Sequence, residues 1–447
     1  MNTLSSLRAG ELAGIKRLDL SGGLTHFPEE IFELADTLEI LNLSGNLLSD
    51  LPGDLPKLHK LRVIFCSDNQ FTHVPEILGQ CPKLEMAGFK ANQIKHLPAA
   101  ALPEKLRWLI LTDNQLSEIP SRIGSCVRLQ KLMLSGNRLQ DLPDEMAACA
   151  RLELLRIAAN RLTKLPDWLL SLPRLSWLAY AGNPFSDAYE VAAMDNLPPI
   201  SHIDWHTLDL QHKLGEGASG VIYRAKLKSA DDTSHVAVKI FRGALTSDGL
   251  PRSEKAACIA AGAHPRLIPV AGKISGHPEG TPGLVMSLID PSFRNLAGPP
   301  SLESCTRDIY PPDTEFTLAT ALNIALGIAS VAEHLHAQGV MHGDLYAHNV
   351  LWDEQGDCLL GDFGAASFIP RQDARLAAAL QRIEVRAFAC LLEELLDHCS
   401  EAPEAQRIVD ALRVLQQRCN QSAIEKRPLF DEIEQTLVAL KDATMKK

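Results

Sequence analysis

Three side chains that carry oxygen donors follow one another in the second half of the chain. Asp344, Asn349 and Asp362 occur in the segments H-G-D-L-Y-A-H-N and G-D-F-G. Carboxylate and amide oxygens are the ligands that hard divalent cations such as Mg²⁺ prefer. Between them, E-Q-G-D (Glu354–Asp357) predicts a hairpin, so two short strands can return Asp362 to the side of Asn349. Three oxygen donors in this order form a specific pattern, because surface acids would have no reason to keep the spacing.

A glycine-rich segment lies nearer the middle of the chain. Gly215, Gly217 and Gly220 have G-x-G-x-x-G spacing, which dinucleotide-binding folds share when a helix follows the glycines. Here the residues from Val221 to Leu227 alternate with a period of two, which indicates a strand. The glycines are therefore predicted to lie in a loop between strands, and V-A-V-K-I-F is predicted to form the next strand.

Taken together, these motifs resemble eukaryotic-type protein kinases. The resemblance implies that the ammonium of Lys239 contacts the α- and β-phosphates of ATP. Glu254, in the predicted helix S-E-K-A-A-C, would orient that ammonium by an ion pair. Asp344 would accept or orient the proton of the acceptor hydroxyl, while Asn349 and Asp362 would hold magnesium.

The resemblance covers about residues 209–437, and K-R-P-L-F-D-E-I near its end is similar to the late R-P helix motif of these kinases. It implies ATP and magnesium as cofactors. Ala237 and Leu351 would sandwich the adenine, and Met286 would guard the back of the pocket. The expected nucleotide-binding residues are Leu214, Gly215, Glu216, Gly217, Ala218, Ser219, Gly220, Val221, Ala237, Lys239, Met286 and Leu351.

Several departures from the family pattern concern substrate and control. Gly343 replaces the loop arginine that normally meets a phosphorylated residue, which makes this a non-RD loop, and Tyr346 replaces a common lysine. No A-P-E motif separates D-F-G from the predicted core helix, in which Glu384 takes the usual place of an aspartate. Between Phe368 and Glu384 there is no Ser, Thr or Tyr, so Ser367 is the one candidate phosphoacceptor of that stretch. We therefore expect activity that does not depend on phosphorylation there.

The first half of the chain repeats an asparagine at nearly constant spacing. Each unit reads L-x-x-L-x-L-x-x-N-x-L-x-x-L-P and resembles the leucine-rich-repeat family, with Ile15–Gly23 as a degenerate first unit. Short strands would stack into a parallel sheet over a leucine core, and each asparagine would satisfy buried backbone groups, a structural role. The asparagines, 22 or 23 residues apart, are Asn46, Asn69, Asn92, Asn114, Asn137, Asn160 and Asn183.

Strand residues between the leucines would form the concave face of the array. This row is rich in apolar and aromatic residues, which is typical of an interaction surface. We expect it to dock a partner protein or this chain's own kinase domain. The predicted protein-binding residues are Phe65, Met86, Trp108, Ile110, Met133 and Trp177, in a row that also holds Ile40, Val63 and Leu154.

Composition limits the remaining possibilities. A net charge of -11 over 447 residues argues against a broad nucleic-acid footprint. The ten cysteines form no C-x-x-C pair, which favours buried reduced thiols and a cytoplasmic location. The longest apolar stretch, near Ala321–Ala332, is interrupted by Asn323 and Ser330, so no membrane span is expected.

The expected fold is an α/β leucine-rich-repeat solenoid followed by an α+β bilobal protein-kinase fold. The boundaries are 12–197 for about eight repeats, 198–208 for a cap or linker, 209–437 for the kinase domain and 438–447 for a C-terminal tail. The expected function is ATP- and Mg-dependent phosphorylation of Ser/Thr hydroxyls, with the repeats as a protein-binding or regulatory module. Two alternatives stay open: a small-molecule phosphotransferase, because H-G-D-x-x-x-x-N also resembles aminoglycoside and choline phosphotransferases, and a catalytically weak scaffold. The sequence also leaves open the choice between Ser/Thr and Tyr, the substrate, the partner and the oligomeric state.

Overall fold

The chain divides into two compact units, described here by a computed structural model over residues 3–195, 197–228, 233–399 and 406–445. The first unit is Met1–Leu175 with Asn183–Phe185, and the second is Ser176–Gly182 with Ser186–Lys447. The predicted boundary at 197 therefore lies elsewhere: the segment Ser176–Gly182 has the sequence pattern of a repeat strand but belongs to the second unit.

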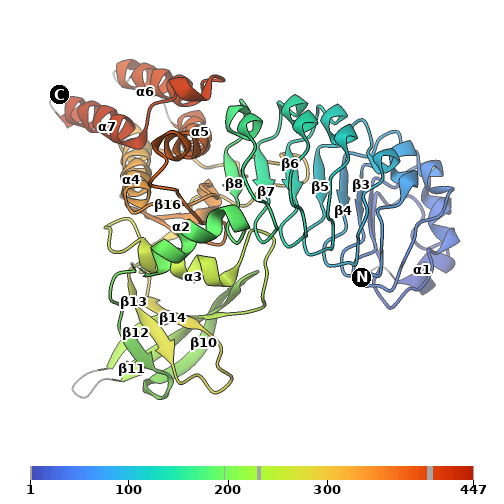
Figure 1. The fold of residues 1–447 in the computed structure, drawn as a ribbon, viewed down its shortest axis with the longest axis horizontal. Coiled ribbons are helices and arrows are strands. Elements are labelled where there is room, and N and C mark those ends of the chain that lie inside the picture. The colour runs from blue at the N-terminus through green and yellow to red at the C-terminus, as the bar shows by residue number, and fades with distance from the viewer. Residues whose placement is uncertain (1–2, 196, 229–232, 400–405, 446–447) are drawn as a thin grey trace. The chain divides into compact units, whose positions relative to one another are not determined.

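Three-residue parallel strands run through the first unit in chain order (Figure 1). Leu41 pairs with Leu18 on one side and with Ile64 on the other, so the near-constant repeat length brings equivalent core residues into register. A short helix, α1 (Leu4–Arg8), precedes them. The strands are β1 (Arg17–Asp19), β2 (Ile40–Asn42), β3 (Val63–Phe65), β4 (Met86–Gly88), β5 (Trp108–Ile110), β6 (Lys131–Met133) and β7 (Leu154–Arg156).

Short 3₁₀ helices connect these strands. Most of them begin directly after a proline that follows Leu, Ile, Val or Phe. The proline itself has an extended backbone, as at Pro143 with ψ 141°. They are Glu29–Leu34, Leu55–Lys57, Glu76–Gln80, Ala99–Ala101, Ser121–Ser125, Asp144–Ala148 and Asp167–Ser171.

The repeated asparagines have the predicted structural role. Nδ2 of Asn137 donates to the carbonyls of Leu111 and Leu134, both at 2.9 Å, and its Oδ1 accepts from the amide of Leu116 at 3.0 Å. Each asparagine thus satisfies backbone groups of its own repeat and of the preceding one. The same pattern recurs at Asn46, Asn69, Asn92, Asn114, Asn160 and Asn183.

A ladder of charged side chains, which the sequence analysis did not identify, crosses the sheet beside the strands. Arg62 lies 3.8 Å from Glu39 and 3.1 Å from Glu85, and Arg107 lies 3.7 Å from Glu85. Opposite charges therefore alternate from one repeat to the next. Such partly exposed pairs contribute little each, about 0.2–1 kcal/mol, but like charges in adjacent repeats would oppose this register.

The concave row is packed sideways more closely than predicted. The ring of Phe65 lies over Gly88, where an added Cβ would come within 2.6 Å of it. The ammonium of Lys131 lies 4.5 Å from the Trp108 ring centroid. Met86 is only 1% exposed, so its prediction as a solvent-facing anchor is wrong. Adjacent parallel strands lie so close that large neighbouring side chains cover one another; Phe65, Trp108, Ile110 and Met133 stay partly exposed.

The second unit contains a six-stranded sheet in the order β10-β11-β12-β14-β13-β9. Its strand β9 (His202–Asp204) pairs in parallel with β13, so the predicted linker 198–208 is in part a sheet strand. The N-terminal elements are β8 (Trp177–Ala179), α2 (Pro184–Asp195), β9, β10 (Leu208–Gly217), β11 (Gly220–Lys228), β12 (Thr233–Phe241), α3 (Pro251–Ala260), β13 (Val270–Ser275) and β14 (Gly283–Ser287).

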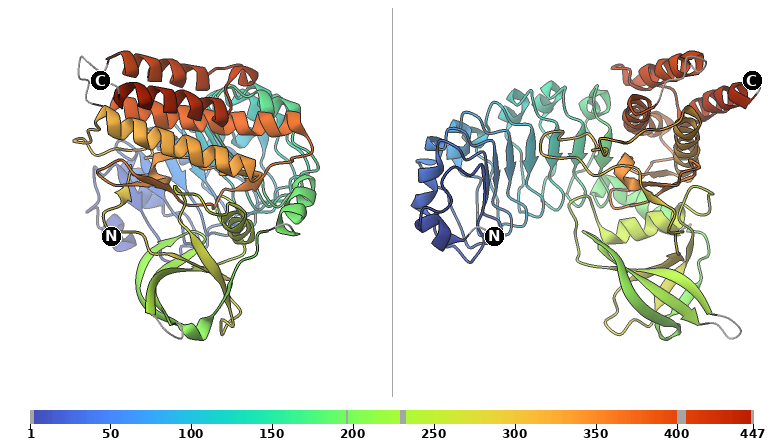
Figure 2. Two further views of the ribbon diagram at one scale, coloured as in Figure 1. Left: turned by 90° about the vertical axis from the view of Figure 1, so that its left-hand side faces the viewer. Right: turned by 180° about the vertical axis from the view of Figure 1, so that it is seen from behind.

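Helices dominate the rest of the second unit. Helix α4 packs against α5 and α7, and α5 packs against α6 (Figure 2). The last helix continues to Met445, through most of the predicted tail, and Lys446 and Lys447 lie outside the described residues. These elements are β15 (Arg294–Asn295), α4 (Leu318–Ala337), β16 (Val340–Met341), β17 (Val350–Trp352), β18 (Cys358–Leu360), β19 (Ser367–Phe368), α5 (Ala374–Asp397), α6 (Gln406–Cys419) and α7 (Phe430–Met445).

Helix α4 contains the longest apolar stretch of the sequence, near Ala321–Ala332. Thr317 caps its start by accepting from the amide of Thr320, and Gly339, with φ +76°, follows its end. Asn323 and Ser330 lie within this helix, which among the described residues is the one that could cross a membrane by length and composition. However, 61% of its most apolar window is buried inside the protein, which is typical of a core helix.

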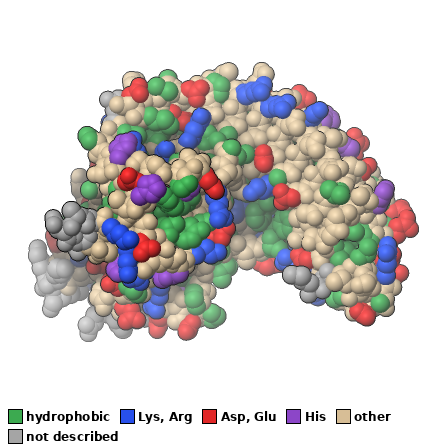
Figure 3. Space-filling model, turned by 90° about the horizontal axis from the view of Figure 1, so that it is seen from below, with side chains coloured by type: hydrophobic (Ala, Val, Ile, Leu, Met, Phe, Trp, Pro, Cys, Tyr) green, Lys and Arg blue, Asp and Glu red, His purple; other side chains and the backbone are tan. Residues whose placement is uncertain are grey.

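Charged side chains of both signs are interspersed over the face drawn in Figure 3. On this face, neither acidic nor basic residues form a continuous field. The excess of negative charge in the sequence is therefore not gathered into one patch there.

Candidate active site

The glycine segment forms the predicted loop between two antiparallel strands. Strands β10 and β11 pair up to Gly217 and Gly220, with Ala218 and Ser219 at the tip. A Cβ on Gly220 would lie 2.2 Å from the carbonyl oxygen of Ile240, so packing against β12 requires glycine there. No described atom lies within 4 Å of a Cβ built on Gly215 or Gly217. Those two glycines leave open space, which suits a loop that approaches a phosphate chain.

Val221, one of the predicted nucleotide contacts, lies on the opposite face of its strand from Lys239. Paired residues of antiparallel strands share a face, and Ile222 pairs with Lys239. Val221 pairs with Ile240, whose side chain packs on the opposite face against the cluster around Val238, and Val221 is 1% exposed. The assignment of Val221 to the face of Lys239 is therefore wrong, and Ile222 is the residue that lies on that face.

Glu216, another predicted contact, has its carboxylate engaged at the outside of the loop. It lies 2.8 Å from Lys213 and 2.8 Å from Arg242, and all three side chains are exposed. Leu214 is 46% exposed beside them. At Glu216 the backbone, and not the carboxylate, is the group left for a nucleotide.

The three residues assigned to the adenine pocket lie on two sheets. Ala237 and Met286 are cross-strand partners on β12 and β14. Leu351 lies on β17, where it pairs with Leu359 and with Asn295. Their role in binding adenine stays a prediction.

Lys239 and Glu254 form the predicted ion pair. Lys239 is on β12, and Glu254 is in the first turn of α3, which Pro251 begins. Glu254 is 2% exposed. Burial disfavours the charge on Lys239 more than any other single influence, but the combined attraction of Glu254 and Asp362 holds the pKa of Lys239 above its usual value. Lys239 is therefore charged and near Asp362.

The catalytic-loop residues are held by hydrogen bonds to one another. Asn349 donates from Nδ2 to both the backbone carbonyl and Oδ2 of Asp344, each at 2.9 Å. A ring nitrogen of His342 lies 2.8 Å from the carbonyl of Gly361, and the amide of Gly361 donates to the carbonyl of Asn349 at 3.0 Å. These bonds place the residue after Gly361, which is Asp362, beside the loop, as the hairpin predicted.

The oxygen donors at this point suit a magnesium ion, which keeps several water ligands, better than a metal ion coordinated entirely by protein side chains. Nδ2 of Asn349 is used by Asp344, so its Oδ1 is the atom left for a cation. Asp362 has φ +55°, and its Oδ1 accepts from the amide of Gly364 at 3.0 Å. No described group of three or more His, Cys, Asp or Glu residues could hold a metal. One amide and one carboxylate suit Mg²⁺, which completes its shell with water and phosphate oxygens.

Glu384 organises the backbone before Asp344. Its carboxylate accepts from the amide of Gly343 at 2.7 Å and from that of His342 at 3.3 Å, and lies 2.7 Å from Nε2 of His336. It is 1% exposed. Burial raises its pKa most strongly, but these donors together hold it below the usual value, so Glu384 is ionised. The sequence indicated its position in the core helix but not this set of bonds.

Ser367, the candidate phosphoacceptor, lies in the protein interior. It is 1% exposed, and its Oγ accepts from the amide of Tyr180 at 3.1 Å. The chain then passes through β19, which pairs with β16, and enters α5 at Ala374. Ser367 is therefore poorly placed for modification.

Phosphatase treatment is expected to leave the turnover of the protein unchanged, and mass spectrometry to find no phosphate on Ser367. Replacement by an acidic residue should mimic activation only if this site is a switch. Ser367→Glu instead buries a charge, so it should lower the free energy of unfolding by about 3 kcal/mol or more. Loss of activity in Ser367→Ala that Ser367→Glu restores would show that phosphorylation of this segment governs the enzyme.

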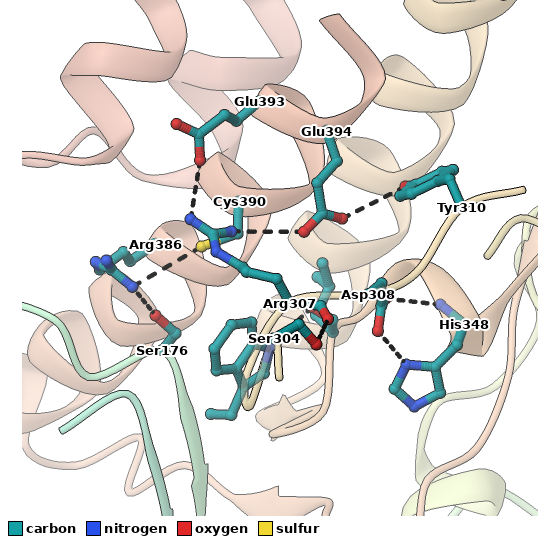
Figure 4. Close-up of polar contacts among 12 residues, drawn as sticks. Ser176, Ser304, Arg307, Asp308, Tyr310, His348, Arg386, Cys390, Glu393 and Glu394 are labelled. Carbon is teal, nitrogen blue, oxygen red and sulfur yellow. Dashed lines mark hydrogen bonds and ion pairs between the residues drawn. The ribbon is translucent and has the colours of Figure 1, made fainter. Parts of the chain in front are cut away.

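A polar cluster beside the loop connects it to α5 (Figure 4). Asp308 accepts from the amide of His348 at 3.0 Å and lies 2.7 Å from its Nδ1. Burial lowers the pKa of His348, but Asp308, with Asp344 and Asp362, raises it overall. His348 therefore lies near both candidate catalytic carboxylates. The sequence analysis missed Asp308, which no motif marks.

The largely buried carboxyl group of Glu394, with a side chain 16% exposed, belongs to the same cluster and should make stability depend on pH. Burial and the nearby charge of Asp308 raise its pKa to about 8, although Arg307 lies 3.5 Å away. Because the folded protein binds this proton more tightly than the unfolded chain, stability should fall as pH rises from about 5 to 8. Glu394→Gln should reduce that fall, on the order of 1–3 kcal/mol, in urea unfolding measured across this range. An unchanged pH slope would contradict the assignment.

Comparisons with known proteins agree with this geometry. A family model described as protein tyrosine and serine/threonine kinase matches residues 208–400. Two leucine-rich-repeat models match residues 37–58 and 127–185.

Curated relatives match over part of their length. A probable leucine-rich-repeat receptor-like serine/threonine-protein kinase of Arabidopsis thaliana is 31% identical over 164 residues, covering 35% of this chain and 24% of that protein. CBL-interacting protein kinase 22 of Oryza sativa is 31% identical over 36% of each chain. Serine/threonine-protein kinase PknK of Mycobacterium tuberculosis is 32% identical over 35% of this chain and 13% of its own length. The chain thus spans between about an eighth and a third of these relatives. With the site geometry, these matches establish that the chain carries N-terminal leucine-rich repeats followed by a domain of the protein kinase family.

Proposed function

We propose that this chain is an ATP- and magnesium-dependent protein kinase that phosphorylates Ser and Thr hydroxyls. The observation that carries the proposal is the buried Lys239–Glu254 ion pair, formed while Asn349 is bonded to Asp344. Kinases need this ion pair and the magnesium-binding aspartate in place together for transfer. The relatives of Arabidopsis thaliana and Mycobacterium tuberculosis named as serine/threonine-protein kinases support the choice of acceptor.

Each residue would have a separate task. Lys239 would bind the α- and β-phosphates through its ammonium, and Glu254 would hold that ammonium in place. The carboxylate of Asp344 would orient the acceptor hydroxyl and take its proton. Asn349 Oδ1 and Asp362 would hold magnesium, which when bound neutralises charge on the β- and γ-phosphates.

The short segment between β19 and α5 favours one alternative enough to test it. In protein kinases this region supports the peptide, whereas here only five residues lie between the end of β19 at Phe368 and the start of α5 at Ala374. A small-molecule acceptor would need no such support. The purified chain should therefore be incubated with labelled ATP, Mg²⁺, generic protein acceptors and, separately, amino-alcohol acceptors. Label on protein is the expected result. Label only on small molecules would instead indicate a small-molecule phosphotransferase, and no transfer to any acceptor would indicate a catalytically weak scaffold.

The repeats would serve as a protein-binding or regulatory module, as leucine-rich repeats generally do. The partly exposed Phe65, Trp108, Ile110 and Met133 are the proposed contact residues. We also propose a cytoplasmic location, supported by ten cysteines that are all free thiols.

A further inference from the structure

One short strand of the second unit contacts the catalytic loop on both sides of Asp344. Strand β8 lies within the segment Ser176–Gly182, which belongs to the same compact unit as the loop. After Asp344, Nε1 of Trp177 donates to the carbonyl of Leu345 at 3.0 Å. The Trp177 ring stacks on Tyr346 with centroids 4.0 Å apart and planes 6° apart.

Gly343, the residue before Asp344, lies close to the backbone of the same strand. This residue has φ +74°, and a Cβ on it would lie 2.8 Å from the carbonyl oxygen of Leu178 and 2.5 Å from that of Ala365. Any side chain, and above all an arginine, would collide with backbone on both sides. Backbone atoms of Ala365 and of Leu178 on β8 together therefore leave no room for a loop arginine at this position.

The segment also holds the chain that follows D-F-G. The amide of Tyr180 donates to Oγ of Ser367 at 3.1 Å, and its hydroxyl donates to the carbonyl of Phe368 at 3.0 Å. At its other end, Ser176 accepts from Nη1 of Arg386 on α5 (Figure 4). The strand is thus bonded to the loop, to the residues after D-F-G and to the core helix.

These contacts are buried and mostly aromatic. Trp177 is 1% exposed, Tyr180 is fully buried and Tyr346 is 4% exposed. The stacked rings resist small displacements, because each shift loses contact area and also the hydrogen bond that Trp177 donates to Leu345. The geometry therefore restrains the backbone on either side of the Asp344 carboxylate.

We propose that β8 replaces a phosphorylated activation segment and that Trp177 is a positioning residue for Asp344. Trp177 acts through Leu345 and Tyr346, which follow Asp344 directly. The proposal rests on the proposed phosphoryl transfer, and it makes the active arrangement part of the folded chain instead of a product of modification. Trp177 was predicted as a contact on an open concave face; it is instead an internal support of the catalytic loop.

The test compares Trp177→Ala and Trp177→Phe in the full chain, with Trp168→Ala as the matched control on a 3₁₀ helix of the first unit. Trp177→Ala should lower kcat by about 10- to 100-fold with KM for MgATP nearly unchanged, because displaced catalytic groups lose rate and not nucleotide affinity. Trp177→Phe keeps the stack and loses only the Nε1 donor, so it should recover most of kcat. A Trp177→Ala/Tyr346→Ala double variant should be no slower than the slower single variant, because both remove one interaction.

Hydrogen exchange separates the proposal from its premise. Amides of Leu345 and Tyr346 should exchange faster in Trp177→Ala than in the parent or in Trp168→Ala, whether or not an acceptor has been identified. If the parent transfers no phosphate but this exchange changes, the proposed function fails and the restraint stands. A folded Trp177→Ala variant with unchanged kcat and unchanged exchange would overturn the inference. If Trp177→Ala does not fold, Tyr346→Ala, which removes the other ring of the stack, gives the same test.

Discussion

Asp344→Ala should lower turnover by about a hundred- to ten-thousand-fold, the usual contribution of a positioned acid-base group. The affinity for MgATP should stay nearly the same, because Lys239, Asn349 and Asp362 remain. Nucleotide titration and single-turnover phosphoryl transfer measure the two quantities separately. The split between a large kinetic effect and a small binding effect distinguishes a catalytic carboxylate from a nucleotide ligand.

Two further variants make this result specific. Asp344→Asn keeps an oxygen that can accept from Nδ2 of Asn349 but cannot take a proton, so it should be about as slow as Asp344→Ala. Asp397→Ala removes an exposed carboxylate at the end of α5 and should keep full activity. Wild-type turnover in both Asp344 variants would show that the active site has been assigned wrongly.

Lys239→Met is expected to abolish detectable transfer and to destabilise the protein as well. The ammonium is the partner of a carboxylate that is only 2% exposed. Removing one member of a buried ion pair leaves an uncompensated charge, at a cost of about 3–5 kcal/mol. Chemical denaturation of the full chain should show this loss in the free energy of unfolding.

A double variant separates stability from chemistry. Lys239→Met/Glu254→Leu removes both charges, and replacing a buried pair by apolar side chains is often neutral for stability. The double variant should therefore regain most of the lost stability yet remain inactive, because no ammonium is left to bind phosphate. A double variant as unstable as Lys239→Met would mean that the ion pair does not account for the effect. Recovered activity would exclude a role for Lys239 in transfer.

The parts of the fold that depend on local pattern could be predicted from sequence. The spacing from Asn46 to Asn183 was sufficient to predict the stacked strands, because each asparagine bonds only to its own and the preceding repeat. The hairpin at Glu354–Asp357 was likewise predictable, and it brings Asp362 beside Asn349 as expected. Lys239 and Glu254 lie on the predicted strand and helix and meet as predicted.

Errors arose where strand register or packing decided the outcome. Strand register shows that Ile222, and not Val221, shares a face with Lys239, because Ile222 is the residue that pairs with Lys239 across the hairpin. No pattern marks β9 within the predicted linker, because its pairing with β13 joins distant segments. The burial of Met86 depends on the sizes of neighbouring side chains in adjacent repeats, which the repeat consensus does not contain.

By itself the sequence determined the order of the two domain types, the structural asparagines and the candidate catalytic residues, because these follow from residue type and short spacing. Only the tertiary structure decided the role of Trp177 and the reason for Gly343. In the sequence, Trp177 has the same position in its repeat as predicted concave-face residues such as Trp108. Gly343 is recognisable there only as the replacement of an arginine. Their connection requires β8 to lie against a loop more than 150 residues away in sequence, at the 168-residue separation of the Trp177–Leu345 bond. Such contacts depend on the packing of whole elements and leave no periodic signal in the chain.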